Sequence, residues 1–516
     1  MFDKQVIFQL VDNKYIDNKI NVSFNVTDNN DYINYITLIS NALKLNYKKY
    51  NNVITKLIIN CHSNNNYTFS YNIFNYFSLN NNLTSISITG RLLNDNNFIL
   101  LCSSLKNNTS LKFLDLAHNN ISDITPLNVI LKNNVITELD LTMNKITNID
   151  NLGDYLKNNT SLKILNLYNN KITDFKNFFE NLKYNKTLKK LNIQYNIHLY
   201  IYDYDNIPSS YVQNYRNNVN YINTYLQNNN SLQELYINNT HYINNMFQIA
   251  FMNGYTNSAD NFLCSIKQQD NNNYNYNLNN YNYDLSNIFK TLEHNNSLKL
   301  LDLGCNVLNN NEYYSLCNML KVNTSISSLY ITNIVNKIKE FNHDCSKLFN
   351  VLKFNNYIQE LKINIYKMNK KEIKNLSEML KYNTSIKKLE IIKNNTSYKD
   401  WFIIYNSLEF NKNLKELHLC NNISPIDETD RRYELYLLCK CLYFNKSIKT
   451  LKIEDESLKN IDLIVDLLKY NHHIKDIFLF EFPRFYRINI NINVINDLKD
   501  KIKKLTIFNK TLYNDY

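Results

Sequence analysis

A repeated phrase between residues 105 and 170 constrains the fold of this chain more than any other feature. The pattern L-x-x-L-x-L-x-x-N occurs there three times, with Ile136 as the first residue of the second copy, and consecutive copies start about 25 residues apart, a period typical of repeat solenoids. In the first copy, Leu114 and Leu116 are two residues apart, so in a strand they lie on the same face. One such strand cannot bury its apolar face alone. The pattern therefore predicts stacked repeats that share one core.

Two asparagine positions recur with this phrase. The Asn that closes it, such as Asn119, follows the strand, and we expect its amide to bond the backbone of the adjacent coil. A second Asn stands three residues before the first apolar position, at the end of a predicted helix. Because the chain has only four glycines, we expect this Asn to be the left-handed residue that ends the helix. It occurs at Asn108, Asn133, Asn159, Asn185, Asn229, Asn295, Asn323, Asn355, Asn383, Asn411, Asn445 and Asn471.

The phrase resembles the leucine-rich repeat family, and the helical segments between the strands make the chain look most similar to the ribonuclease-inhibitor-like subclass. The resemblance implies an α/β solenoid, a curved horseshoe with parallel strands on its concave face and helices on its convex face. It also implies a protein that scaffolds, inhibits or recognises another protein.

The register of the phrase predicts four regions along the chain. They are an N-terminal cap at 1–50 with short strands at 5–12 and 20–26 and a helix at 31–45, repeats at 51–240, an irregular region at 241–297, and repeats with a C-terminal cap at 298–516. The irregular region has two predicted helices, near 244–252 and 258–268, and an Asn/Tyr-rich tract at 269–283. The sequence leaves open whether this tract is a degenerate repeat or a disordered loop.

Charge and cysteine content restrict the classes of protein that the chain can belong to. The net charge of +11 permits anionic partners, but no long run of like charges occurs. Nine cysteines without fixed spacing do not predict a disulfide framework, so we expect a cytoplasmic protein, with the nucleus as the alternative. No apolar run is long enough for a membrane span or a signal peptide. Triplets of the form N-x-S/T, such as Asn108-Thr109-Ser110, are attributed to the abundance of Asn.

The sequence predicts no catalytic residues, no cofactor and no metal site. The glycines are isolated, so no phosphate-binding loop is expected. Cys439 and Cys441 have no His at a zinc-site spacing, and the groups at 343–345 and 472–473 are interpreted as chance neighbours. Four cysteines fall at or beside apolar positions and are expected to be core thiols. They are Cys61, Cys102, Cys317 and Cys439.

The third and fifth positions of the phrase are predicted to point away from the core, into the concave groove. Exposed aromatic residues beside charges are typical of protein interfaces, so we expect a protein partner to bind there and the protein itself to be a monomer. The candidate binding residues are Phe113, Asp115, Glu138, Asp140, Ile164, Asn166, Tyr236, Asp302, Tyr330 and His418.

Two other functions remain open from the sequence. The first is regulation of a small GTPase or another enzyme, for which no residue can be named. The second is nucleic-acid binding by a row of lysines at the second position of the phrase, which could form a basic rim. An acidic groove beside these lysines makes nucleic acid the less favoured partner. They are Lys112, Lys163, Lys189, Lys299, Lys387, Lys415, Lys449, Lys475 and Lys503.

Overall fold

The computed structural model describes residues 19–25, 40, 41, 43, 54–62, 71–196, 209–237, 285–304, 308, 310–331, 345–365, 368–393, 398–421, 428–454, 461–481 and 504–509. The chain divides into two compact units, Met1–His241 and Tyr242–Tyr516. Several predicted elements lie outside the described residues: the strand at 5–12, the helices near 244–252 and 258–268, the tract at 269–283, and most of the helix at 31–45. The four predicted regions therefore stay predictions.

The first unit contains a parallel sheet in which each strand pairs with the next one along the chain. Its described strands are β1 (Lys19–Asn25), β2 (Lys56–His62), β3 (Ser85–Thr89), β4 (Phe113–Asp115), β5 (Glu138–Asp140), β6 (Ile164–Asn166), β7 (Lys190–Asn192) and β8 (Glu234–Tyr236). The predicted cap strand at 20–26 is β1, and it joins this sheet directly by pairing with β2. The register aligns equivalent core positions, so that Leu114 pairs with Leu139 and Leu139 with Leu165.

The second unit repeats this arrangement. Its described strands are β9 (Leu300–Asp302), β10 (Ser328–Ile331), β11 (Glu360–Ile365), β12 (Lys388–Lys393), β13 (Glu416–Asn421), β14 (Thr450–Glu454), β15 (Asp476–Glu481) and β16 (Lys504–Asn509). Neighbours are again parallel and consecutive, and Leu361, Leu389 and Leu417 occupy equivalent places in the register. Parallel neighbours need a crossover connection, which the helices supply.

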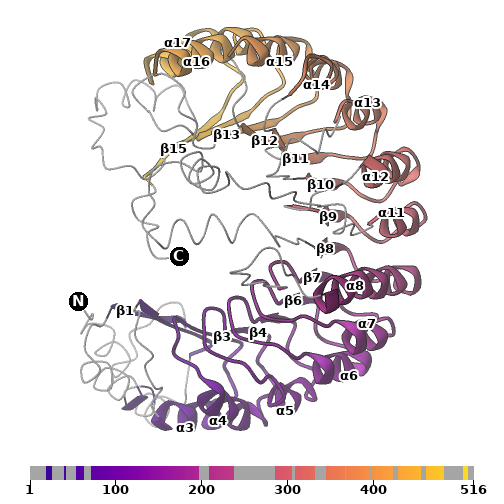
Figure 1. The fold of residues 1–516 in the computed structure, drawn as a ribbon. Helices are drawn as coiled ribbons and strands as arrows, with labels where there is room; N and C mark the ends of the chain where they lie inside the picture. The colour runs from indigo at the N-terminus through magenta and orange to yellow at the C-terminus, as the bar shows by residue number, and fades with distance from the viewer. Residues whose placement is uncertain are drawn as a thin grey trace, which may run out of the picture. The chain divides into compact units, whose positions relative to one another are not determined.

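Helices form a second layer in each unit, and in Figure 1 they lie on the outer side of the strands of their own unit. In the first unit they are α3 (Tyr71–Leu79), α4 (Asp95–Leu105), α5 (Leu127–Leu131), α6 (Asp150–Asn158), α7 (Lys176–Leu182) and α8 (Ser209–Asn228). In the second unit they are α11 (Ser286–Leu292), α12 (Asn310–Val322), α13 (Ser346–Phe354), α14 (Lys370–Tyr382), α15 (Tyr398–Phe410), α16 (Glu428–Leu442) and α17 (Ile461–Tyr470). The prediction of an α/β repeat solenoid is confirmed.

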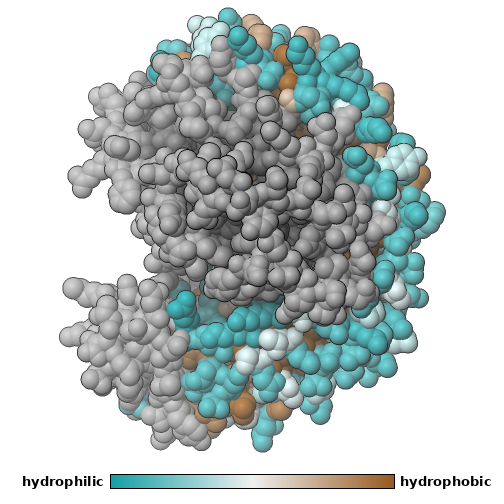
Figure 2. Space-filling view, viewed as in Figure 1, coloured by the Kyte–Doolittle hydropathy of each residue, from teal (hydrophilic) through white to brown (hydrophobic). Residues whose placement is uncertain are grey.

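The core lies between the two layers of each unit. The leucines of the phrase are buried completely or nearly so, as Leu114 and Leu139 show. Helix α8 begins at Ser209 and contributes Val219 and Ile222 to the core. On the face seen in Figure 2, the described residues present mostly hydrophilic side chains, with hydrophobic ones as separate spots. Burial of one face of each strand against the helices explains this division.

The Asn at the end of each helix does not have the predicted left-handed conformation. Asn159, Asn355 and Asn383 are extended, with φ of −73°, −72° and −67°. The prediction was wrong because the side chain, rather than the backbone conformation, ends the helix. In Asn383, Oδ1 accepts hydrogen bonds from the N–H groups of Ser385 and Ile386, and Nδ2 donates to carbonyl groups of the preceding repeat.

Most left-handed residues occur after the strands instead, whereas Asn134, with φ of 51°, follows helix α5. His118, Met143, Asn169 and Tyr195 have φ between 52° and 57°, and each directly precedes the Asn that closes the phrase. This backbone conformation turns the chain out of the strand. None of the four is glycine, so each carries a small conformational cost.

The Asn that closes the phrase behaves as predicted. In Asn144, Nδ2 donates to the carbonyl of Leu116 one repeat earlier, at 2.9 Å, and Oδ1 accepts from the N–H of Ile121, at 3.1 Å. The equivalent Asn119 and Asn170 make the same kinds of bond. This second asparagine ladder satisfies backbone groups that would otherwise be buried without partners.

The N-x-S/T triplets also have a structural origin, so abundance of Asn alone does not explain them. In the triplet at 383–385, Oδ1 of Asn383 accepts from the N–H of Ser385, and the Ser385 hydroxyl donates to the carbonyl of Asn355 at 2.8 Å. The triplet at 445–447 repeats this arrangement. Both polar side chains of the triplet thus join one repeat to the next.

The predicted core thiols Cys102, Cys317 and Cys439 are buried, and the side chain of Cys61 lies outside the described part of the chain. Burial raises the pKa of the Cys317 thiol to about 11, which makes it a poor nucleophile at neutral pH.

Among the described residues, no helix has both the length and the apolar character needed to cross a membrane.

Candidate functional site

The ten predicted binding residues all lie on strands, on the face opposite the core, and all are half-buried. Between Phe113 and Asp115, Leu114 is fully buried, and the same alternation holds at Glu138, Leu139 and Asp140. The structure places seven of the ten residues in the first unit and Asp302, Tyr330 and His418 in the second. The inward and outward directions predicted from the sequence are therefore those of the structure.

Several of the acidic residues on this face have a local structural role that was not predicted from the sequence. Asp115 Oδ1 accepts from the N–H of Ala117, and Asp140 Oδ1 accepts from the N–H of Thr142, so each closes the turn after its own strand. Asp302 does the same with Gly304. In these three repeats the acidic residue therefore has a structural role whether or not it contacts a partner.

The acidic groups of the first unit lie close together. Asp115 and Asp140 are paired across neighbouring strands, and Asp115 Oδ2 accepts from the Ser87 hydroxyl at 2.7 Å. Burial raises the pKa of Asp115, and the nearby Asp140 raises it further, against the lowering effect of the hydrogen bonds. This part of the face favours a positively charged group on any partner.

A lysine is held between a carboxylate and an aromatic ring at the last described strands of the first unit. The Nζ of Lys190 lies 3.1 Å from Glu234 Oε2 and 4.9 Å from the centre of the Tyr236 ring. The Tyr236 hydroxyl donates to the same Glu234 oxygen at 3.0 Å. These contacts fix the ring of Tyr236 beside an ion pair, a combination found at interface anchors.

A row of polar and charged side chains runs across neighbouring strands of the second unit, on the face opposite the core. Tyr330, Lys362, Glu390 and His418 are successive neighbours on β10 to β13. The Tyr330 hydroxyl donates to Glu360 Oε1 at 3.0 Å, and Lys362 Nζ lies 2.7 Å from Glu390 Oε1. Burial raises the pKa of Tyr330, and the Glu360 carboxylate adds to this effect, so the phenol stays protonated.

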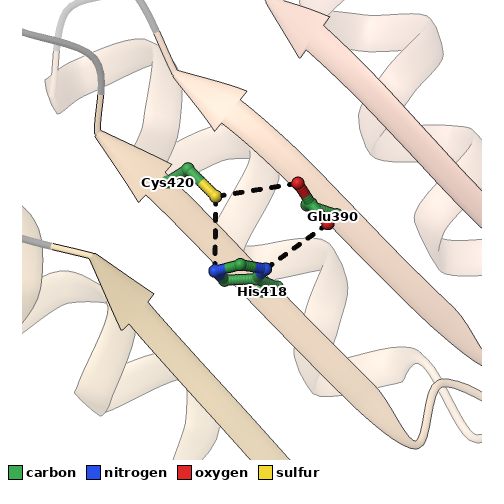
Figure 3. A group of neighbouring side chains, drawn as sticks. All are labelled: Glu390, His418 and Cys420. Atoms are coloured by element: carbon green, nitrogen blue, oxygen red, sulfur yellow. Dashed lines mark hydrogen bonds and ion pairs between the residues drawn. The ribbon is translucent and has the colours of Figure 1, made fainter. Parts of the chain in front are cut away.

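Three side chains with different chemistry meet at the centre of this row, as Figure 3 shows. His418 and Cys420 lie on β13, and Glu390 lies on the adjacent β12. Cys420 Sγ is 3.3 Å from His418 Nε2, and His418 Nδ1 is 3.5 Å from Glu390 Oε2. Burial opposes ionisation of Glu390, but hydrogen bonds from His418 and Lys362 outweigh it and lower the pKa to about 2.

Glu390 and His418 both stand at the fifth position of the phrase, which the sequence predicts to point away from the core, but only His418 was named as a candidate binding residue. Glu390 stands 28 positions before His418 in the numbering, and only the register of the two strands makes them neighbours. The signal that could have found Cys420 is its place two residues after His418, which puts both side chains on the same face of a strand.

The structure also shows an exposed row that was not predicted from the sequence, here named the aromatic rim. Each member directly precedes the Asn that ends its helix. The rim consists of Phe354, Tyr382, Phe410, Phe444 and Tyr470, all of which are more than half exposed. The ammonium group of Lys353 lies 4.8 Å from the centre of the Tyr382 ring, and that of Lys381 lies 4.6 Å from the centre of the Phe410 ring. Aromatic and basic groups therefore alternate on this edge of the second unit.

The lysines at the second position of the phrase lie where the chain enters each strand. Lys112, Lys163, Lys299, Lys387, Lys415 and Lys475 are exposed, Lys189 and Lys449 are half-buried, and Lys503 lies outside the described residues. The N–H of Lys415 bonds to the carbonyl of Lys387, and the N–H of Lys449 to that of Lys415. Backbone contact of this kind places the lysines of consecutive repeats side by side.

Parallel strands that each pair with the next, alternating with helices in a second layer, define each unit as an α/β repeat solenoid. Sequence comparison agrees: the family described as "Leucine Rich repeats (2 copies)" matches residues 109–154. Over these residues the chain is similar to leucine-rich repeats.

Other comparisons add little to this assignment. No curated protein matches the chain. A solved structure titled "Leiomodin-1 Actin-Binding Site 2 (ABS2)" matches with 18% sequence identity and a TM-score of 0.25, over 30% of this chain and 86% of that one. At this TM-score the likeness does not define the fold, which rests on the strands and helices themselves.

Proposed function

We propose that this protein, as a leucine-rich repeat protein, is a non-enzymatic scaffold or recognition protein. It would bind a protein partner through the strand face, which is the face of the strands opposite the core. The observation that carries the proposal is that this face holds charged and aromatic side chains that the core does not use. Tyr236, Tyr330 and Lys362 are half-buried on rigid strands, and each has a fixed neighbour of opposite charge or polar character.

Such a face suits recognition because its side chains are already ordered before a partner arrives. Contact with Glu234 orders Tyr236, and contact with Glu360 orders Tyr330. Ordering a free side chain at an interface costs about 0.5–1.5 kcal/mol, and a side chain that is already ordered avoids much of that cost. Ion pairs such as Lys362–Glu390 would select a partner by complementary charge more than they would add affinity.

Affinity capture from the source cell with matched variants tests this proposal. The test variant is Tyr236→Ala with Tyr330→Ala, which removes one aromatic side chain from the strand face of each unit. The control is Tyr314→Ala, because Tyr314 is 60% exposed on helix α12 instead of a strand. Quantitative mass spectrometry should show partners retained by the wild type and by the control but depleted at least tenfold in the test variant.

Equal retention of every partner by all three proteins would contradict binding through the strand face. Unfolding temperatures of the three proteins should agree closely, since a destabilised variant would lose partners for another reason.

We further propose that the repeats belong to the ribonuclease-inhibitor-like subclass, because a helix follows most strands, and that the protein acts in the cytoplasm as a monomer. Regulation of a small GTPase stays a prediction that the described residues do not test.

The aromatic rim supports a second candidate function, binding of single-stranded nucleic acid. Bases stack on exposed aromatic rings, and lysines neutralise the phosphates. In four consecutive repeats an exposed ring is followed five residues later by a lysine at the start of the strand. These pairs are Tyr382 with Lys387, Phe410 with Lys415, Phe444 with Lys449, and Tyr470 with Lys475.

Fluorescence anisotropy with a labelled single-stranded oligonucleotide tests this second function. Binding should weaken steeply as salt rises, and it should fall at least tenfold in Phe410→Ala with Phe444→Ala. The control is Phe402→Ala, because Phe402 is exposed near the start of helix α15, away from the aromatic rim. Absence of binding at low salt, or equal binding by all three proteins, would remove this candidate.

A further inference from the structure

The cluster of Glu390, His418 and Cys420 brings three kinds of metal-ligating atom to one place. His418 and Cys420 are two residues apart on β13, so both side chains leave the same face of the strand. Glu390 is the register partner of His418 on β12, and side chains paired across strands lie about 5 Å apart at Cβ. A carboxylate oxygen, an imidazole nitrogen and a sulfur, one from each residue, all lie within 4.8 Å of one another.

The distances suit a tetrahedral ion. Zinc bonds of about 2.3 Å to sulfur and about 2.1 Å to nitrogen or oxygen, at the tetrahedral angle, place neighbouring donors about 3.6 Å apart. In the structure, Cys420 Sγ is 3.3 Å from His418 Nε2 and 3.9 Å from Glu390 Oε1. Since all the donor atoms lie within 4.8 Å of one another, shifts of about 1 Å or less in these side chains would be enough to enclose an ion.

The setting of the cluster also fits a metal site. Cys420 is buried, and Glu390 and His418 are half-buried, so the three groups are partly shielded from water while one side of the cluster stays open. Strands β12 and β13 are paired along six residues, which fixes the backbone beneath the donors. A site on paired strands holds its ligands more exactly than a loop does.

We propose that Glu390, His418 and Cys420 form a binding site for a thiophilic divalent cation, with Zn²⁺ as the ion that best fits one sulfur, one nitrogen and one oxygen donor. Three protein ligands leave the fourth tetrahedral position to water or to a donor from outside the chain. Binding transfers the Cys420 thiol proton to solvent, since the thiolate is the ligand, and the site gains its full affinity only with His418 neutral.

Lys362 would compete with the cation for the carboxylate of Glu390. Its ammonium group lies 2.7 Å from Glu390 Oε1, the oxygen that also faces Cys420. A divalent cation at this oxygen must displace or repel the ammonium. Removal of the Lys362 charge should therefore strengthen cation binding, whereas in a purely structural network it should have no such effect.

Calorimetric titration of the full chain with Zn²⁺, and absorption spectroscopy with Co²⁺, test the proposal. The wild type should bind one ion with an affinity that falls at least tenfold in Cys420→Ser and in His418→Gln. Co²⁺ should give a sulfur-to-metal charge-transfer band in the wild type that is absent from Cys420→Ser. The control is Cys345→Ser, because Cys345 is a half-buried cysteine in a different repeat; it should keep both signals.

Lys362→Met provides the second measurement, and it should bind Zn²⁺ several-fold more tightly than the wild type. Far-ultraviolet circular dichroism of each metal-free variant should match the wild type, so that lost binding reports the site and not the fold. Zinc binding that is unchanged in Cys420→Ser and His418→Gln would overturn the proposal. So would the absence of any binding by the wild type and by Lys362→Met at micromolar protein concentration.

Discussion

The side-chain amide of Asn185 donates a hydrogen bond of 3.0 Å to the main-chain carbonyl of Asn159, the residue in the same position one repeat earlier. The same bond joins Asn383 to Asn355, also at 3.0 Å, and Asn471 to Asn445, at 2.8 Å. Each of these asparagines also closes its own turn through Oδ1. One side chain therefore ends a helix and attaches its repeat to the preceding one.

The role of Asn383 predicts that glycine cannot replace it. Asn383→Gly and Asn383→Ala should each lower the free energy of unfolding by about 2–4 kcal/mol, because four hydrogen bonds to buried or half-buried backbone groups are lost. Urea unfolding followed by circular dichroism measures the change. Thr384→Ala, at an exposed neighbour, should be close to neutral. If glycine were tolerated and alanine were not, the backbone conformation would matter after all.

Alternation along β5 predicts opposite results for adjacent residues. Leu139 is 1% exposed, so Leu139→Ala should cost about 2–5 kcal/mol of stability through lost burial and a cavity. Glu138 is half-buried on the other face, and Glu138→Ala should change the stability by less than about 0.5 kcal/mol. Chemical denaturation of both variants under the same conditions measures the difference. Equal losses would mean that the two faces are assigned incorrectly.

Replacement of Gly153 by alanine should have the opposite effect on stability from that usually seen in a helix. A Cβ at this position of α6 would lie 2.7 Å from the Cα of Phe178 in α7, closer than real Cβ atoms approach backbone. Alanine normally stabilises a helix by about 1 kcal/mol over glycine, but here Gly153→Ala should lower the stability by about 1–3 kcal/mol because the two helices must separate. Thermal unfolding checks the sign. A rise in the melting temperature would show that the helices can move apart without loss.

The lowered pKa of Glu390 predicts a specific dependence of stability on pH. Hydrogen bonds from His418 and Lys362 overcome burial and place this pKa at about 2, below the ordinary value of 4.5. The ionised carboxylate therefore stabilises the folded state fully above about pH 4.5, and this contribution is lost as the pH falls toward 2. Discounted for solvent screening, it amounts to about 1–2 kcal/mol.

Urea unfolding of Glu390→Gln and of the wild type between pH 6 and pH 2.5 measures this contribution. The stability difference between them should be largest near pH 6 and should shrink as the solution becomes acidic. Glu138→Gln is the control, since Glu138 forms no ion pair with the other described residues. A difference that stays constant with pH would contradict the lowered pKa of Glu390.

Residues that act within one repeat could be interpreted from the sequence, and so could the Asn that closes the phrase, whereas most contacts between repeats could not. The burial of Leu114 and Leu139 and the outward direction of Phe113 and Asp115 follow from a period of two along a strand. The wrong prediction for the helix-ending Asn has a different cause. A left-handed turn and a side-chain cap both favour Asn, and only its contacts with the preceding repeat distinguish them.

The sequence by itself determined the repeat, the alternation of strand and helix, and the two faces of each strand, because these depend on residues a few positions apart. Only the tertiary structure decided that Glu390 meets His418 and Cys420, and that the aromatic rings of successive helices share one edge. The physical reason is that these contacts join side chains of different repeats, so they form only when the repeats stack.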